Sequence, residues 1–594
     1  EVSRGVLQNE PALLKQCIER AEGNPLFLDQ LLRNATNHDN SDTLPGSIES
    51  MLIASVDRLP LAERRSLKAA SIYGQWFTLD MVNHITGAPD SLFSAALTGQ
   101  VLRSENGGFI FTHSLMQEAI YNSHLSKQKK ALHIRAAEWY DGKDSMLIAQ
   151  HLDRGESPNA ASSYLEAARD CEARFQFTRG LPLIERGLDL SKDAIQKFHL
   201  TCLQASMTRE TGKAEQAREL YETALTMIED EALQCLAFLG MASCNRWMGR
   251  GEESAQILEQ TENTARSNRE HNLLSQVGYY RGSYLFTKNE LDNAITSYGD
   301  GLANAEKCGN KTWIARNLSG LADCYYANLQ MSKALSYFLE CINISHEEGL
   351  GRIEVPNRYM TGLTRRYLNE MKAGLDDILS AQKLARDVGH HRCEMYSTNF
   401  VAEFLLDMGD VDAALSASNR ALELTFMTQN ERFRAYVMNQ QARGLMELGN
   451  KAEALKVLEK AVQISRKVGM SFVGPRLLGT LALCTEEEKI HSAALKEGFN
   501  ILNTGCHAHN QLWFLRDAIE SCLRTNQTAK ALKYADHMET ITTGEPLAWA
   551  KYFIERARAI VHSKTNPKDP TNEKEFVRLE QIAKNAGFSQ ATLH

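Results

Sequence analysis

Histidine and cysteine residues that could hold a metal ion lie close together at two places in this 594-residue sequence. The two groups are His390-His391-x-Cys393 and Cys506-His507-x-His509. A structural zinc ion requires four ligands that converge on one point, and these two groups are far apart in the chain. We therefore predict that both groups occupy turns at the surface and that the chain holds no metal.

Nucleotide chemistry and hydrolysis require motifs that this sequence does not contain. Phosphate binding by the loop Gly-x-x-x-x-Gly-Lys-Ser/Thr depends on its glycines, its lysine and its hydroxyl. Gly212-Lys213-Ala214 lacks the first glycine and the hydroxyl, and Gly309-Asn310-Lys311-Thr312 has the wrong spacing. No His-Glu-x-x-His and no convincing nucleophile–base spacing occurs. The sequence predicts that this chain is not an enzyme and that it binds no cofactor on its own.

The composition of the chain argues against nucleic acids and membranes as its partners. The chain is 43% hydrophobic and 24% charged, which is typical of a folded protein. Its net charge of −8, from 66 basic and 74 acidic residues, argues against a nucleic-acid partner, because phosphate neutralisation requires a basic surface. No apolar run approaches the ~18 residues that cross a membrane. The 12 cysteines are scattered without a Cys-x-x-Cys pair, which indicates a reducing compartment and a cytoplasmic location.

Small residues recur along the chain at a step of 40. The first series is Ala242, Gly282, Ala322, Gly362, Ala402, Ala442 and Ala482, and a second series runs from Ala294 to Ala494 twelve positions later. Only Pro356, Pro475 and Pro546 interrupt residues 191–562, so this stretch can be almost entirely helical. Small residues let antiparallel helices approach closely, and each helix pair buries its apolar face against its neighbours. The pattern predicts an α-solenoid, with Lys451–Val468 as one of its helices.

The small residue, the alanine twelve positions on and the larger residues that follow together resemble the tetratricopeptide repeat. The usual period of that repeat is ~34 residues, so each unit here has about six additional residues. The resemblance covers roughly residues 158–590. It implies a concave surface formed by the first helix of each pair, where a protein or peptide ligand would bind.

Counting along the first helices predicts which side chains line that concave surface. Tyrosine, arginine and asparagine dominate, and the first two are enriched at binding hot spots. In peptide-binding tetratricopeptide domains, asparagines at such positions hold the ligand backbone, so Tyr396 with Asn399 and Tyr436 with Asn439 resemble a repeated clamp. The predicted ligand-binding residues are Gln276, Tyr279, Arg316, Asp323, Tyr326, Tyr359, Arg366, Tyr396, Asn399, Glu403, Tyr436, Asn439, Arg443 and Arg476.

The first 150 residues do not repeat. Helices are predicted over Leu61–Ile72 and Phe77–Ile85, and a two-stranded hairpin is predicted on either side of Glu105-Asn106-Gly107-Gly108. Helices followed by a small hairpin predict a winged-helix layout in an otherwise all-α chain. The predicted domains are 1–44, the end of a nucleotide-binding module (lid helices); 45–157, winged-helix-like; 158–562, the solenoid; and 563–594, a C-terminal cap.

Gly23-Asn24-Pro25-Leu26-Phe27-Leu28, a winged helix with Phe109-Ile110-Phe111-Thr112-His113 and a repeat array together resemble the C-terminal half of a bacterial STAND signalling ATPase. The kind most similar is fused to class III adenylate or guanylate cyclases or forms large ATP-binding regulators. The resemblance implies that Pro25 contacts adenine, that His113 senses the phosphates, and that ATP or ADP with Mg²⁺ binds only together with an upstream nucleotide-binding domain.

The function expected from this resemblance is a sensor whose concave surface binds a protein or peptide and thereby controls the upstream domain. Two alternatives stay open: a transcription regulator that uses its winged helix on DNA, and a passive scaffold. The segment predicted as the recognition helix has no lysine or arginine, which disfavours DNA. The sequence leaves open the ligand, the effector and whether the chain forms a homo-oligomer.

Overall fold

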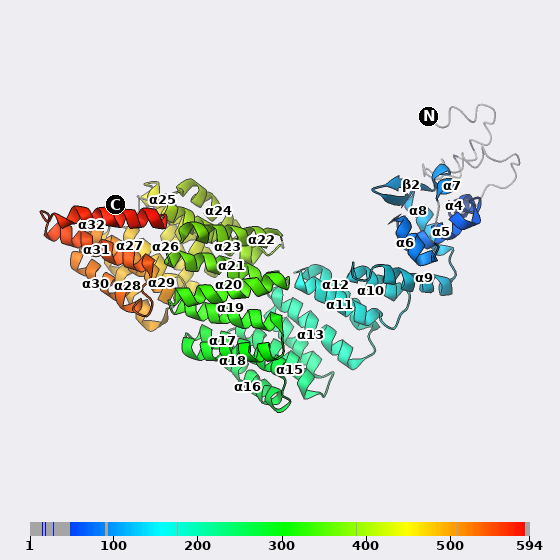
Figure 1. The fold of residues 1–594 in the computed structure, drawn as a ribbon, viewed down its shortest axis with the longest axis horizontal. Coiled ribbons are helices and arrows are strands. Elements are labelled where there is room, and N and C mark those ends of the chain that lie inside the picture. The colour runs from blue at the N-terminus through cyan, green and yellow to red at the C-terminus, as the bar shows by residue number, and fades with distance from the viewer. Residues whose placement is uncertain are drawn as a thin grey trace. The chain divides into compact units, whose positions relative to one another are not determined.

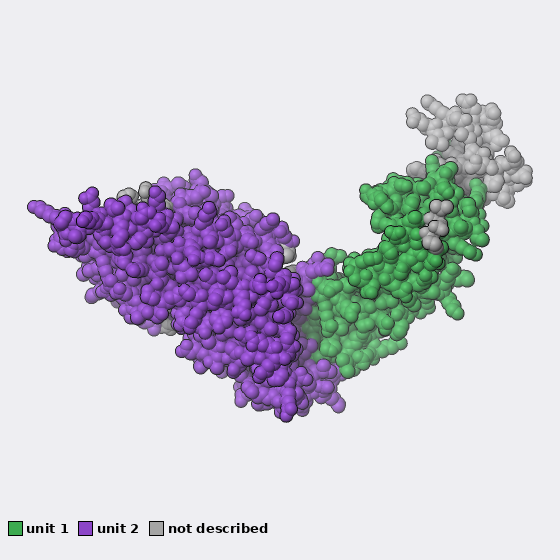
Figure 2. Space-filling view, viewed as in Figure 1, with its two compact units in different colours: residues 1–171, 178–203 green, residues 172–177, 204–594 purple. Residues whose placement is uncertain are grey.

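The computed structural model describes residues 48–588 apart from 89–92, 175, 388 and 507, together with Lys15, Ile18 and Leu28. Apart from Lys15, Ile18 and Leu28, the predicted lid helices lie outside these residues, and so does Pro25. The chain forms two compact units, residues 1–171 with 178–203 and residues 172–177 with 204–594 (Figure 2).

Unit 1 consists of helices and one small sheet. Its elements are α4 (Ile48–Asp57), α5 (Leu61–Ser71), β1 (Trp76–Phe77), α6 (Leu79–Thr86), α7 (Ser94–Thr98), β2 (Leu102–Glu105), β3 (Gly108–Phe111), α8 (Ser114–Asn122), α9 (Ser126–Trp139), α10 (Ser145–Arg154) and α12 (Phe177–Leu190). Helices α11 (Ala160–Ala173) and α13 (Ala194–Glu210) each begin in unit 1 and end in unit 2, and the first residue of α12, Phe177, also belongs to unit 2.

The sheet of unit 1 confirms the predicted hairpin and adds a strand. Strands β2 and β3 pair antiparallel around Asn106 and Gly107, both with positive φ, as a tight hairpin turn requires. Strand β1 pairs with the other edge of β3. The prediction of a helix beginning at Phe77 was therefore wrong: this ring is fully buried and lies against Phe93 and Phe111, and helix α6 begins two residues later. The winged-helix assignment itself stays a prediction.

Unit 2 is a stack of antiparallel helix pairs (Figure 1). Its helices are α14 (Ala214–Leu225), α15 (Glu231–Trp247), α16 (Gly251–Ser267), α17 (His271–Thr287), α18 (Leu291–Lys307), α19 (Lys311–Ala327), α20 (Met331–Glu347), α21 (Gly351–Tyr367), α22 (Met371–Asp387), α23 (His391–Met408), α24 (Val411–Met427), α25 (Glu431–Glu447), α26 (Lys451–Val468), α27 (Gly474–Cys484), α28 (Glu488–Gly505), α29 (Ala508–Arg524), α30 (Thr528–Ile541), α31 (Ala548–Thr565) and α32 (Thr571–Ala586). The predicted α-solenoid is confirmed, and α26 has the predicted bounds.

The turns explain why the period is 40. Helices α19 and α20 have 17 residues each, and three residues separate each helix from the next. Every turn from α15 to α27 contains one residue with positive φ, so these residues recur at a step of 20. They are Gly249, Arg269, Asn289, Gly309, Leu329, Gly349, Asn369, Gly389, Gly409, Gln429, Gly449 and Gly469. Glycine or asparagine occupies most of these positions because the left-handed region penalises other side chains.

Small residues allow the close approach of paired helices. Ala322 and Ala334 of α19 and α20 are fully buried, and the ring of Tyr298 from α18 packs over Gly282 and Gly320 of the helices on either side. The small-residue series therefore marks the contacts that the sequence predicted.

Replacing Gly320 with alanine should lower the free energy of unfolding, by about 1–3 kcal/mol, because its β-carbon would overlap the Tyr298 ring. Gly299 in α18 provides the control, since a β-carbon there meets nothing within 4 Å. Gly299→Ala should instead stabilise the protein by up to about 1 kcal/mol, the usual gain for a helix interior. Urea denaturation followed by circular dichroism measures both, and equal effects of the two changes would contradict the packing argument.

The solenoid of unit 2 folds back on itself at its C-terminal end. Helix α29 packs against α19, and α31 packs against α21. The Glu545 carboxylate accepts a hydrogen bond of 2.7 Å from the Ser332 hydroxyl and one of 3.0 Å from the Ser332 backbone N–H. The repeat pattern did not predict this closure, because contacts between helices far apart in the chain leave no periodic signal in the sequence.

Candidate ligand-binding site on the concave face

A cavity of about 280 Å³, here named the aromatic cavity, lies among the first helices of six successive repeats, from α17 to α27, and α29. Its walls are mostly aromatic and carry a few charged groups. The lining residues include Phe286, Asp323, Tyr326, Tyr359, Arg366, Tyr367, Tyr396, Phe400, Glu403, Phe433, Tyr436, Phe472, Arg476, His509, Asn510 and Trp513. An apolar cavity with a few converging polar groups is the usual form of a ligand site.

An outer hollow of about 500 Å³ adjoins the aromatic cavity. The two share Phe286, Tyr396, Phe433, Phe472, His509 and Asn510 as lining residues. The outer hollow also has Asn289, Arg392, Arg432 and Ser471, which are exposed to solvent. A ligand can therefore approach the aromatic cavity from solvent through the outer hollow.

Eight of the predicted ligand-binding residues line the aromatic cavity: Asp323, Tyr326, Tyr359, Arg366, Tyr396, Glu403, Tyr436 and Arg476. Arg443 lines a smaller neighbouring hollow of about 150 Å³, together with Glu403 and Arg476. The structure thus gathers side chains that are up to four repeats apart in sequence.

The other predicted residues lie elsewhere. Gln276 is buried in α17, and Arg316 lies over the rings of Tyr279 and Trp313. Asn399 and Asn439 are 0% exposed, and neither side-chain amide forms a hydrogen bond with the residues that the structure describes. In this conformation no ligand can reach these two amides, and neither asparagine lines the aromatic cavity. Their role as a clamp stays a prediction.

Glu403 of α23 is the centre of a buried ion network. Its carboxylate pairs with Arg366 of α21 and, at 2.8 Å, with Arg476 of α27. It also accepts a hydrogen bond of 2.8 Å from the Tyr436 hydroxyl, which in turn accepts one of 2.6 Å from Arg476. Burial alone would raise the pKa of Glu403, but Arg476 and Arg366 outweigh burial and hold it at about 2. Glu403 is therefore ionised and links four successive first helices.

The same network extends to α29. The Asp517 carboxylate pairs with Arg443 and accepts hydrogen bonds of 2.9 Å from the Thr480 hydroxyl and 3.0 Å from Arg516. Asp407 lies 3.5 Å from both Arg516 and Arg366 and so joins the two halves. Although burial favours its neutral form, Arg443 and Arg516 lower the pKa of Asp517. The network of four arginines and three carboxylates connects α29 to the repeats.

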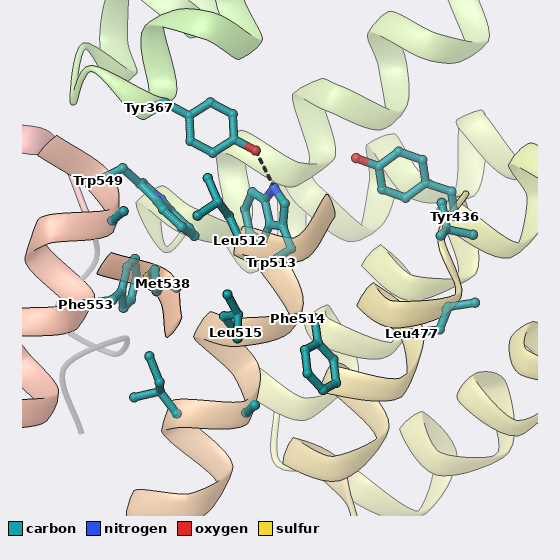
Figure 3. Packing of buried hydrophobic residues seen from close by; sticks show 14 of the residues in the cluster. Tyr367, Tyr436, Leu477, Leu512, Trp513, Phe514, Leu515, Met538, Trp549 and Phe553 are labelled. Carbon is teal, nitrogen blue, oxygen red and sulfur yellow. Dashed lines mark hydrogen bonds between the residues drawn. The ribbon is translucent and has the colours of Figure 1, made fainter. Parts of the chain in front are cut away.

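Trp513 lies at the point where α29 meets the cavity. Its indole N–H donates a hydrogen bond of 2.8 Å to the Tyr367 hydroxyl, drawn as a dashed line in Figure 3. The guanidinium groups of Arg476 and Arg516 lie 3.9 Å and 4.3 Å from its ring centre, within the range of cation–π attraction. Trp513 therefore forms one end of the aromatic cavity and a contact that closes the solenoid.

Asp323 of α19 differs from the carboxylates of the network. It lines the aromatic cavity but makes no hydrogen bond or ion pair with the residues that the structure describes. Burial raises its pKa to about 7. Asp323 is thus a carboxyl group that faces the cavity without a partner.

Sequence reasoning missed several residues of the site. Trp513 and Asp517 of α29 were not reached by counting along the sequence. Arg516 continues the series that includes Arg476, 40 residues on, and could have been found in that way. Phe400 and Phe433 line the cavity from α23 and α25, two helices of the predicted α-solenoid. Aromatic residues on the first helices were a usable signal that counting from the small-residue series did not include.

The other sequence predictions concern a metal site, the nucleotide sensor His113 and a membrane span. Among the described residues, no three His, Cys, Asp or Glu side chains converge on a possible metal site. His390 accepts a hydrogen bond of 3.2 Å from the Cys393 backbone N–H and so caps α23. His113 is half-buried directly before α8 in unit 1, and its role as a nucleotide sensor stays a prediction. None of the described helices is both long and apolar enough to span a bilayer.

Comparisons with known proteins identify repeats in unit 2. Two tetratricopeptide repeat models match residues 197–305 and 435–468. An uncharacterized protein of Rhizobium meliloti (strain 1021) is 25% identical over an alignment that covers 36% of this chain and 25% of that protein. This chain thus spans about a quarter of the length of that relative.

Among solved structures, a Signal Transduction ATPase with Numerous Domains (STAND) protein with a tetratricopeptide repeat sensor from Pyrococcus horikoshii is similar, with a TM-score of 0.51. It is 14% identical, and the match covers 75% of this chain and 68% of that one. A Rap protein complexed with Competence and Sporulation Factor matches with a TM-score of 0.47 and 15% identity over 59% of this chain and 98% of that one. At these identities the likeness concerns the fold.

Proposed function

We propose that this chain is the sensor and regulatory part of a multidomain STAND-type signalling ATPase. Unit 2 binds a peptide or protein ligand in the outer hollow and the aromatic cavity. Ligand binding then controls a nucleotide-binding domain upstream and its effector, for which a class III cyclase is one candidate. The observation that supports this proposal best is the solvent-connected aromatic cavity on the concave side of a tetratricopeptide-type solenoid.

The geometry favours a ligand over a passive scaffold. Aromatic rings from α21, α23 and α25 surround a hollow that the protein's own core leaves unfilled. Aromatic and arginine side chains of this kind supply most of the binding energy at interfaces. A ligand transmits a signal only if it prefers one of two conformations. Helix α29 meets both the cavity and the first helices, so a ligand that prefers one position of α29 would bias the whole of unit 2.

Replacing Tyr396 and Phe472 together with alanine should reduce ligand capture more than tenfold, since each ring lines both hollows and hot-spot truncations cost about 2 kcal/mol or more. The 594-residue chain would be immobilised, incubated with lysate of the source organism, and the bound peptides and proteins identified by mass spectrometry. Phe426→Ala with Met427→Ala is the matched control, because both side chains are exposed on α24. Equal capture by the cavity variant would place the site elsewhere, and no capture by any form would favour the scaffold.

The upstream part of the proposal has a separate test in the coding sequence that precedes Glu1. A phosphate-binding loop of the type Gly-x-x-x-x-Gly-Lys-Ser/Thr would support control of a nucleotide-binding domain. A second DNA-binding domain in its place would support the transcription regulator instead.

A further inference from the structure

Asp323 occupies an unusual position for a carboxyl group. It projects from α19 into the aromatic cavity, whereas the other carboxylate of the cavity, Glu403, is paired with Arg366 and Arg476. Asp323 is partly exposed within the cavity, so its carboxyl group lies in a partly desolvated site where a counter-ion is attracted more strongly than in bulk water. An unpaired carboxyl in a ligand cavity therefore indicates a partner that the ligand itself brings.

The groups that face Asp323 supply no positive charge. Tyr298 of α18, Cys341 of α20 and Tyr359 of α21 interact with it electrostatically, as does Cys324 on its own helix. All four have raised pKa values, chiefly because they are buried, so they stay neutral around pH 7. A cation that enters the cavity would meet a carboxylate with no competing ion pair.

The walls of the cavity suit a cation on a long apolar stem. Tyr326, Tyr359, Tyr396 and Phe400 contribute rings to the lining, and ring faces attract ammonium and guanidinium groups. A volume of about 280 Å³ is smaller than most pockets for whole drug-sized ligands. The size therefore fits one long side chain better than an entire peptide, and the adjoining outer hollow would hold the rest.

We propose that the aromatic cavity binds the lysine or arginine side chain of a peptide ligand, with Asp323 as its counter-ion. This inference rests on the proposed function, because it specifies the ligand of the same site. It predicts that peptides without a basic residue bind poorly, whatever their apolar content.

A free pentapeptide library with known composition is the probe. The 594-residue chain would be equilibrated with the library at pH 8, separated by gel filtration, and the retained peptides sequenced by mass spectrometry. We expect at least tenfold enrichment of lysine or arginine at one position. Asp323→Asn should abolish this enrichment, whereas the charge-matched control Asp376→Asn, at an exposed site on α22, should retain it.

A second arm of the experiment uses pH. Lysine and arginine stay charged between pH 8 and 5.5, but Asp323 gains a proton in this range because burial raises its pKa to about 7. Enrichment by the wild type should therefore fall at pH 5.5. His509 is a further ionisable side chain that lines the cavity. Any pH dependence that Asp323→Asn retains would belong to His509 or to another group.

The outcomes separate the two proposals. Enrichment of peptides without a basic preference, or a basic preference that Asp323→Asn keeps, would overturn the role of Asp323 and leave peptide sensing intact. No enrichment by the wild type would overturn the binding of a basic side chain, and the capture experiment with lysate would then decide whether unit 2 binds a protein ligand. Circular dichroism of each variant confirms that it is folded, and the change from aspartate to asparagine preserves the size of the side chain.

Discussion

Replacing Glu403 with glutamine should lower the free energy of unfolding by about 3–5 kcal/mol, the usual cost of removing one partner from a buried ion pair. The change leaves the guanidinium group of Arg476, at 2% exposure, without its paired carboxylate, and it leaves Arg366, at 1% exposure, with Asp407 at 3.5 Å as its remaining carboxylate. Urea denaturation followed by circular dichroism at pH 7 measures the loss. Glu453→Gln is the control, because its pair with Lys456 lies at the surface and should contribute about 1 kcal/mol or less.

The pH dependence of stability tests the same ion network independently. The pKa of Glu403 is lowered to about 2 in the folded protein from an ordinary value of 4.5. A lowered pKa of a carboxyl group means that its contribution is fully present above about pH 4.5 and is lost as pH falls towards 2. The difference between wild type and Glu403→Gln should therefore shrink in this window. A difference that stays constant down to pH 2 would contradict the assigned role.

Replacing Asp323 with asparagine should raise the free energy of unfolding at pH 8, whereas Glu403→Gln should lower it. Burial raises the pKa of Asp323 from 3.8 to about 7, and one pKa unit corresponds to ~1.4 kcal/mol. Because the side chain faces a cavity that can admit water, we expect a gain of about 2–4 kcal/mol. The destabilisation by the wild-type carboxylate develops as pH rises from about 4 to 7, so the gain should vanish at pH 4.

Urea denaturation of the two proteins at pH 4, 6 and 8 measures this gain, and Asp376→Asn serves again as the exposed control. A stabilised Asp323→Asn variant that no longer enriches basic peptides would show that the carboxyl is kept for binding at the expense of stability. Asp323→Asn that is less stable than the wild type at pH 8 would show that the carboxyl has a structural partner.

The regular part of the fold was predictable because it is determined by local spacing. The 40-residue series of small residues and the helix over Lys451–Val468 follow from helical periodicity and from turns that favour glycine or asparagine. Prediction was less accurate where tertiary packing determines the secondary structure. Phe77 pairs in a strand because its ring is buried among other rings, although the local pattern favoured a helix.

The candidate site was predictable only in part, for a related reason. Arg366, Glu403 and Arg476 lie on first helices whose facing side follows from the repeat, so counting along the sequence found them. Counting could not predict which of these residues pair with one another. It also could not predict that Trp513 and Asp517 complete the site, because this depends on contacts between segments that are far apart in the chain. Asn399 and Asn439 were predicted to face the ligand, but they are fully buried. Tyr396 and Tyr436, about one helical turn before them, do line the cavity.

The closure of unit 2 also restricts how this protein can change its length during evolution. Open solenoids gain and lose whole repeats readily, because each repeat contacts only its neighbours. Here Glu545 has to reach Ser332, and Trp513 has to reach Tyr367. Inserting or deleting one 40-residue unit between these residues would rotate and shift one partner away from the other. The ion pair of Glu210 with Arg352 links α13 to α21 in the same way. Duplication or loss of one repeat anywhere between α13 and α31 would therefore break at least one of these contacts.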